Sequence, residues 1–165
     1  MKKYLVLTFP LFLTACVQYS TPALKTQLQV REFQTRTFDT TNTNEVLTAV
    51  VEAFQDQGFM VKNVVPQVGL VSAIKEVDLE DPAQVFMKTF LGGSNAVWEK
   101  NSVVEATANV RTLKGQTKVR ATFQEKVMNN RGTLDTVSTI EDPKFYQGFF
   151  DKVGKSIFIE KQHIR

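Results

Sequence analysis

The 165-residue chain has a single cysteine and a single histidine, which leaves few groups for metal binding or nucleophilic catalysis. One thiol cannot form a disulfide within the chain, so the fold has to be stabilised by its hydrophobic core. His163 has Glu160 as a candidate co-ligand, but a solvent-exposed histidine close to the end of the chain is the simpler interpretation. The sequence therefore predicts no metal site.

Motifs of common catalytic and nucleotide-binding sites are absent as well. The chain has no GxSxG nucleophile motif, no GxGxxG dinucleotide motif and no P-loop. Asp78, Glu80 and Asp81 form an acidic cluster that could bind a cation weakly, although acidic residues are also favoured at the start of a helix. We predict no catalytic residues and a non-enzymatic protein.

Long hydrophobic runs are missing too. The apolar stretch 4–12 is interrupted by Pro10 and is well short of the about 20 residues that span a bilayer. A basic start (MKK) precedes this stretch, and the small residues Thr14 and Ala15 follow it. These are the three parts of a secretory signal. We therefore expect residues 1–15 to be a signal peptide that is removed.

Leu13, Thr14, Ala15 and Cys16 resemble the lipobox of bacterial lipoproteins, in which leucine and two small residues precede a cysteine. In that family, signal peptidase II recognises the first three positions and cuts before the cysteine. The cysteine thiol carries diacylglycerol, and its new amino group is acylated. The resemblance implies that Cys16 is the lipidation site. The alternative is an ordinary signal peptide with a coincidental cysteine.

The same resemblance implies a location. Two or more acyl chains hold a protein stably in a membrane, so diacylglycerol and an N-acyl chain such as palmitate would anchor Cys16. Val17 follows it, whereas lipoproteins retained in the inner membrane of Gram-negative bacteria commonly have aspartate there. We expect a protein anchored in the outer membrane and facing the periplasm, with no cofactor besides its lipid.

The charge and length of residues 16–165, which remain after such a cleavage, limit the possible partners and the number of domains. Without Lys2 and Lys3, the 20 basic side chains become 18, against 17 acidic ones, so the charge does not indicate a nucleic-acid partner. Residues 16–29 are polar and lack a clear period, which predicts a lipidated cysteine followed by a flexible tether. Residues 30–165 fit a single α+β periplasmic domain.

Residue patterns predict the elements of that domain. Alternation predicts a strand over 30–38. Asn42, with Glu45 three residues later, predicts a capping box at the start of a helix over 43–57, and Gly58 predicts the end of that helix. The remaining elements are expected as strands over 59–65 and 70–76, a short helix over 82–91, a loop over 95–101 with Trp98, a hairpin of strands 102–113 and 116–128 about Lys114 and Gly115, a strand over 134–140 and a helix over 143–161.

This order, β-α-β-β-(α)-β-β-β-α, predicts a two-layer α+β sandwich, with a mostly antiparallel sheet covered by the long C-terminal helix. The arrangement resembles the helix-grip fold. With the lipobox and tether, it is similar in outline to envelope lipoproteins such as BamC of the outer-membrane β-barrel assembly machinery. The stretch FQDQGF (54–59) is a helix-to-strand step found in many such domains. The resemblance carries no functional residues across.

Two functions remain open for the domain. A member of an envelope assembly (secretion, efflux or outer-membrane assembly) would use an exposed strand edge or apolar patch for protein–protein contacts. A carrier would instead hold a small apolar ligand or lipid between the sheet and the C-terminal helix, in a cavity beneath Phe149, Phe150 and Val153. We favour the first, because the sequence has an anchor and tether pattern and no catalytic motif.

Arg111, Lys118 and Arg120 form a candidate basic patch on the exposed face of the predicted hairpin. Anionic lipid headgroups or glycans are the ligands that such a patch would attract. Glu105, Glu125 and other acidic residues are available to neutralise it. A solvated face of mixed charge is therefore the expectation.

Overall fold

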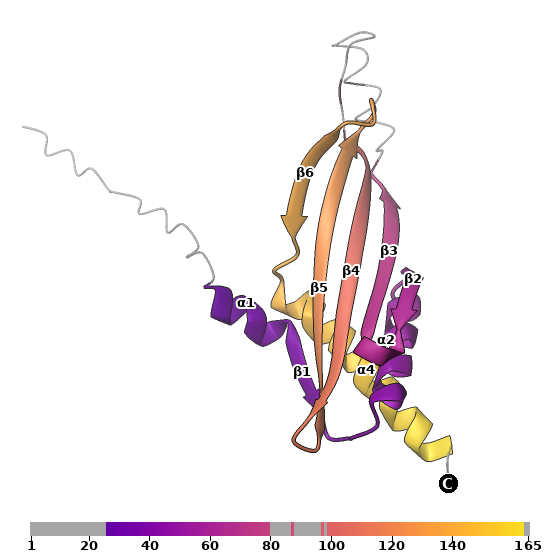
Figure 1. The fold of residues 1–165 in the computed structure, drawn as a ribbon. Helices are drawn as coiled ribbons and strands as arrows, with labels where there is room; N and C mark the ends of the chain where they lie inside the picture. The colour runs from indigo at the N-terminus through magenta and orange to yellow at the C-terminus, as the bar shows by residue number, and fades with distance from the viewer. Residues whose placement is uncertain (1–25, 80–86, 88–96, 98, 164–165) are drawn as a thin grey trace, which may run out of the picture.

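The computed structural model describes residues 26–79, 87, 97 and 99–163 (Figure 1). Its helices are α1 (Gln27–Phe33), α2 (Thr43–Asp56) and α4 (Pro143–His163), with a short 3-10 turn η1 (Pro66–Val68). Its strands are β1 (Thr35–Phe38), β2 (Met60–Val65), β3 (Leu70–Asp78), β4 (Glu99–Leu113), β5 (Gln116–Asn129) and β6 (Leu134–Thr139). No described helix is both long and apolar enough to cross a membrane.

All strand pairings are antiparallel, and β5 is paired along both of its edges. The sheet order is β1-β5-β4-β3-β2, and β6 also pairs with β5. β1 and β6 share one edge of β5, because β1 pairs with residues 117–120 and β6 with residues 124–128. The hairpin of β4 and β5 turns at Lys114 and Gly115, as predicted. Both residues have positive φ.

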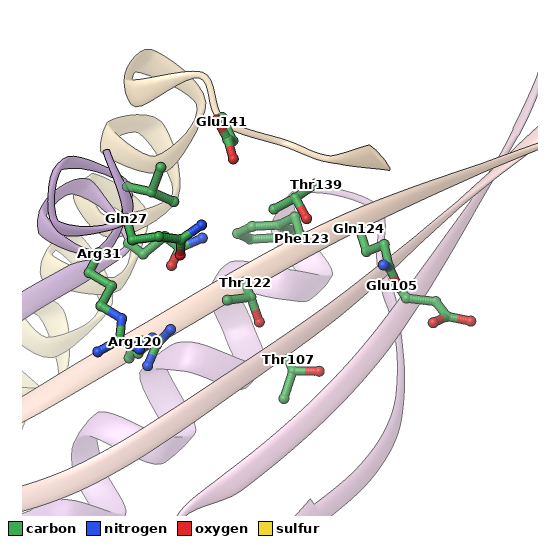
Figure 2. A pocket seen from close by; sticks show the side chains of 12 residues that line it. Gln27, Arg31, Glu105, Thr107, Arg120, Thr122, Phe123, Gln124, Thr139 and Glu141 are labelled. Atoms are coloured by element: carbon green, nitrogen blue, oxygen red, sulfur yellow. The ribbon is translucent and has the colours of Figure 1, made fainter. Parts of the chain in front are cut away.

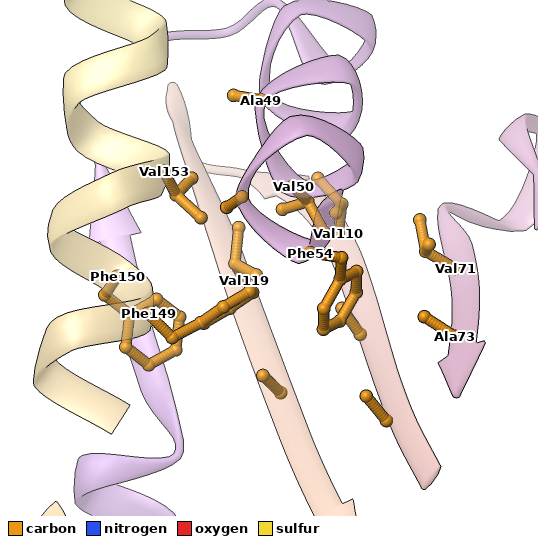
Figure 3. Packing of buried hydrophobic residues seen from close by; sticks show 14 of the residues in the cluster. Ala49, Val50, Phe54, Val71, Ala73, Val110, Val119, Phe149, Phe150 and Val153 are labelled. Atoms are coloured by element: carbon orange, nitrogen blue, oxygen red, sulfur yellow. The ribbon is translucent and has the colours of Figure 1, made fainter. Parts of the chain in front are cut away.

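Helices α2 and α4 cover one face of this sheet, which confirms the predicted two-layer α+β class (Figures 1 and 3). Alternate residues of β4 and β5 point toward the helices and are buried; they are Val104, Ala106, Ala108, Val110, Val119, Ala121 and Phe123. Small residues on β4 let the helices approach the sheet closely, and the aromatic rings fill the space between the layers. The opposite face of the sheet, called the open face below, carries neither α2 nor α4.

Helix α2 confirms the prediction for residues 43–57 to within one residue. The Asn42 side chain accepts a hydrogen bond from the Glu45 amide at 3.2 Å, and Gly58 follows the helix with φ of 78°. The reciprocal half of the capping box differs, because the Glu45 carboxylate accepts from the Thr40 hydroxyl at 3.4 Å. The backbone N–H of Asn42 donates to that same hydroxyl at 3.2 Å, so the Thr40 hydroxyl bridges the Asn42 backbone and the Glu45 carboxylate.

The strand predicted over residues 30–38 is wrong in its first half. Residues 27–33 form α1, which also takes up the last three residues of the predicted tether. The reason is a complete capping box: Thr26 Oγ1 accepts from the Gln29 amide at 3.3 Å, and Gln29 Oε1 accepts from the Thr26 amide at 2.8 Å. Val30 and Phe33 then lie one helical turn apart on the face directed at the core.

Several predictions fall on residues that the structure does not describe. These are the signal peptide, most of the tether, Trp98 and, apart from Met87, the helix over 82–91. In the described part, the strand expected to start at residue 102 begins at Glu99. The predicted helix over 143–161 extends to His163.

Candidate binding groove on the open sheet face

The open face is polar but mostly uncharged over its central strands. Residues that alternate with the buried ones point away from the helices. In the middle of the sheet these are Ser72, Thr107, Asn109, Thr122 and Gln124. Hydroxyl and amide groups in register on a solvent-accessible sheet offer donors and acceptors to a ligand without a large desolvation cost.

A groove of about 360 Å³ lies beside these residues, between α1, β4 and β5 (Figure 2). It exists because β1 and β6 leave a gap along the shared edge of β5, and α1 packs next to that gap. The backbone groups there are satisfied: the Ala121 amide donates to the Gln34 carbonyl, and the Ile140 amide to the Phe123 carbonyl, both at 2.9 Å. The groove is lined by Gln27, Val30, Arg31, Gln34, Glu105, Thr107, Arg120, Thr122, Phe123, Gln124, Thr139 and Glu141.

The inner wall of the groove is fixed by a buried polar contact. Gln34 is only 3% exposed, and its Nε2 donates to the hydroxyl of the fully buried Tyr146 at 3.4 Å. Burial raises the pKa of the Tyr146 phenol, and hydrogen bonds with Gln34 and the Phe123 backbone offset this only in part. The phenol therefore stays neutral and ties α1 to α4.

Two guanidinium groups give the groove its electrostatic character. Arg31 of α1 and Arg120 of β5 both line it, and neither forms an ion pair within the described part of the chain. The cross-strand neighbours of Arg120 are the uncharged Thr35 and Asn109. The Glu105 carboxylate forms an ion pair with the Lys126 ammonium at 2.6 Å, so the charge of Glu105 is already neutralised. The groove thus has two cationic donors available for a carboxylate or another planar anion.

The three residues of the candidate basic patch lie on one face of the sheet, and the two glutamates expected to neutralise them have other partners. Arg111 and Lys118 lie directly opposite each other in the β4–β5 register, and Arg120 follows on the same face. Glu105 pairs with Lys126, while Glu125 points to the helix side and accepts from the buried Ser102 hydroxyl at 2.7 Å. Neither glutamate is therefore available to the patch.

The space that the carrier alternative requires, beneath Phe149, Phe150 and Val153, is filled by side chains. Phe149, Phe150 and Val153 are buried, and the Phe149 ring centroid lies 5.0 Å from Phe54 and 5.3 Å from Phe150 (Figure 3). A different, mostly apolar hollow of about 370 Å³ lies nearer the start of α4. It is lined by Asp56, Gln57, Phe59, Lys75, Val77, Val104, Phe145 and Lys152.

The other predicted site residues are not brought into this groove. Leu13, Thr14, Ala15 and Cys16 lie outside the described residues, as do Glu80 and Asp81 of the acidic cluster. Across the described ranges, no group of three His, Cys, Asp or Glu side chains is arranged to hold a metal ion.

Arg31 and Gln34 were missed as groove residues because residues 30–38 were predicted to be a strand. The Thr26–Gln29 spacing of a capping box is the signal that could have identified the helix.

No family model matches the sequence, and no curated protein shows significant similarity to it.

Proposed function

We propose that this chain is a non-enzymatic, lipid-anchored lipoprotein of the bacterial envelope, whose domain binds a partner protein at the edge strand β6 and the groove beside it. The anchor is Cys16, by the resemblance of Leu13-Thr14-Ala15-Cys16 to a lipobox. The expected location is the periplasmic side of the outer membrane. The observation that carries the binding role is a groove lined by Arg31 and Arg120, neither of which forms an ion pair within the described part of the chain, beside an exposed edge strand.

The edge strand β6 supports a protein partner in particular. All six of its residues are exposed, and within the described part of the chain β6 pairs only with β5. Three residues of its sequence, LDTVST, are β-branched, and the strand contains neither the proline nor the lysine that commonly protects an edge. An extended segment of another protein can add to such an edge through main-chain hydrogen bonds.

The groove supplies specificity for such a segment. A strand added next to β6 would pass Thr139 and Glu141, which line the groove with Arg31 and Arg120. A carboxylate on that segment would accept charge-assisted hydrogen bonds from the two guanidinium groups. The partner chemistry that fits is therefore an extended, acidic peptide segment within an envelope assembly.

The carrier remains the second candidate, supported by the hollow near the start of α4. Its apolar wall of Phe59, Val104 and Phe145, with the Lys75 ammonium above the Phe59 ring at 5.8 Å, suits the acyl chain and headgroup of a lipid. Native mass spectrometry of protein purified from the envelope separates the two functions. A stoichiometric lipid adduct lost on Phe145→Lys substitution would favour the carrier.

Replacing Cys16 with alanine should abolish incorporation of labelled palmitate and release the protein from the membrane fraction, because the thioether has no other thiol on which to form. The measurement is metabolic palmitate labelling followed by fractionation. Thr14→Ser, which keeps a small residue, is the control and should label normally. Persistent labelling of the alanine variant would contradict the anchor.

Replacing Arg31 and Arg120 together with glutamine should reduce partner capture about tenfold or more, because two charge-assisted hydrogen bonds are lost. Capture is measured with a photo-crosslinking residue at Thr122, on the groove wall, followed by mass spectrometry of the adducts. Lys144→Gln with Lys155→Gln on α4 removes equal charge away from the groove. If the α4 variant loses as much capture, net charge rather than the groove is responsible.

A further inference from the structure

The turn end of the β4–β5 hairpin combines exposed apolar side chains with cations. We call this surface the basic end and define it by Val68, Arg111, Leu113, Lys114 and Lys118. Leu113 is 66% exposed and Val68 56% exposed. Both line a hollow of about 570 Å³ that Arg111 and Lys118 also line. Lys114, in the left-handed region with φ of 52°, forms the turn itself.

The cations of the basic end have no acidic counterparts in the described ranges. Arg111 and Lys118 are directly opposite each other across the β4–β5 ladder, an arrangement that destabilises a sheet unless an anion lies between the charges. Neither they nor Lys114 form an ion pair with any described carboxylate. The surface is therefore complementary to an external layer of negative charge.

Hydroxyl contacts hold the basic end rigid. The Thr112 side chain lies 2.7 Å from the Thr43 hydroxyl and 2.8 Å from the Thr117 hydroxyl. Thr117 is buried, and its hydroxyl donates to the Thr40 carbonyl at 2.7 Å. These bonds join the hairpin to the segment between β1 and α2, so the exposed cations and Leu113 are presented from a fixed support.

We infer that the basic end lies on an anionic lipid surface and orients the domain on its membrane. Exposed aliphatic side chains next to lysine and arginine are typical of protein surfaces at the headgroup level of a bilayer. A protein groove would be expected to surround its ligand, whereas here Leu113 and Lys114 project from a turn. This inference rests on the proposed lipid anchor, which brings the domain to a membrane.

The chain length allows this orientation. The ten Cα–Cα steps from Cys16 to Thr26 span at most about 35 Å when extended. β1 leads from α1 toward the hairpin turn (Figure 1), and its four residues cover only about 13 Å. An anchored Cys16 can therefore lie in the same membrane that the basic end contacts, with β6 and the upper part of the sheet directed away from the lipid.

The test is binding of the full chain to vesicles, with Cys16→Ala in every variant so that an acyl anchor does not mask the contact. Vesicles of phosphatidylglycerol mixed with phosphatidylcholine are compared with vesicles of phosphatidylcholine alone by co-sedimentation. Neutralising Arg111, Lys114 and Lys118 to glutamine should reduce the preference for the anionic vesicles about 100-fold, since each cation near the surface contributes about a factor of five. Added salt should weaken binding of the parent chain.

Matched variants decide the outcome. Lys144, Lys155 and Lys161 changed to glutamine remove the same charge from α4 and should leave the preference nearly unchanged. Leu113→Asn should weaken binding to both kinds of vesicle while circular dichroism shows an intact fold. An equal loss in the α4 variant, or an unchanged preference in the basic-end variant, would overturn the inference. The same three substitutions in a chain that retains Cys16 are also tested for palmitate labelling. Labelling reports the lipid anchor, so the result distinguishes a failure of the proposed anchor from a failure of the basic-end contact.

Discussion

Replacing Phe123 with alanine should lower the free energy of unfolding by about 3–5 kcal/mol, the usual range for removing a buried phenylalanine. The side chain is fully buried on β5. Its ring centroid lies 4.8 Å from Phe145, 5.4 Å from Tyr146 and 5.4 Å from Phe149. The same ring lies 6.0 Å from Phe54 of α2 and 5.8 Å from Phe59. Its loss therefore leaves a cavity between the sheet and both helices.

The control for this change is Phe158→Ala, because Phe158 is a phenylalanine of α4 that is 61% exposed. It removes the same atoms from a position that is already largely in water and should cost less than about 1 kcal/mol. Urea unfolding of the full chain, followed by circular dichroism, gives both values. Equal losses in the two variants would contradict the ring cluster as the centre of the core.

The parts of the fold that could be predicted from the sequence are those set by local patterns. Helix α2 was found from Asn42, Glu45 and Gly58, and the β4–β5 hairpin from alternation about Lys114 and Gly115. In both cases neighbours in the chain also satisfy the backbone hydrogen bonds. α1 was missed because VREF (30–33) alternates in sequence and also satisfies a helical spacing, and the Thr26–Gln29 capping box decides between the two.

The groove could not be predicted, because it depends on contacts between distant segments. Its position follows from two strands sharing one edge of β5, and β1 and β6 are about 100 residues apart. The basic patch was placed correctly by alternation along β5. The same alternation puts Glu125 on the helix side with Phe123, a signal that argued against neutralisation by that residue.

The orientation inferred for the basic end gives the two proposed surfaces separate roles. Lys118 and Arg120 are two residues apart on one strand face, about 7 Å, so the lipid contact and the groove are adjacent. A membrane beneath Arg111 and Lys118 would bring the groove close to the headgroups while leaving β6 accessible. Arg120 is therefore close enough to take part in both contacts, whereas Arg31 lies in α1 and Lys114 at the hairpin turn, so the variants of these two residues are tested in different assays.

Replacing Gly69 with alanine should also cost about 3–4 kcal/mol, for two reasons that add. Gly69 has φ of 65°, and an L-residue there loses about 1–2 kcal/mol. In addition, a Cβ atom built on Gly69 would lie 2.0 Å from the Val110 carbonyl oxygen. The backbone would have to move, and the 2.7 Å hydrogen bond from the Val110 amide to the Gly69 carbonyl would weaken or break.

Gly132→Ala separates these two contributions. Gly132 has a similar φ of 74°, but no described atom lies within 4 Å of the position of an added Cβ. Its substitution should cost only the conformational part, about 1–2 kcal/mol. Urea unfolding with unchanged m values measures the difference between the variants. If the two variants lose the same free energy of unfolding, the backbone around Gly69 accommodates an added Cβ atom without further loss. The close approach of Gly69 to the Val110 carbonyl would then not contribute to stability.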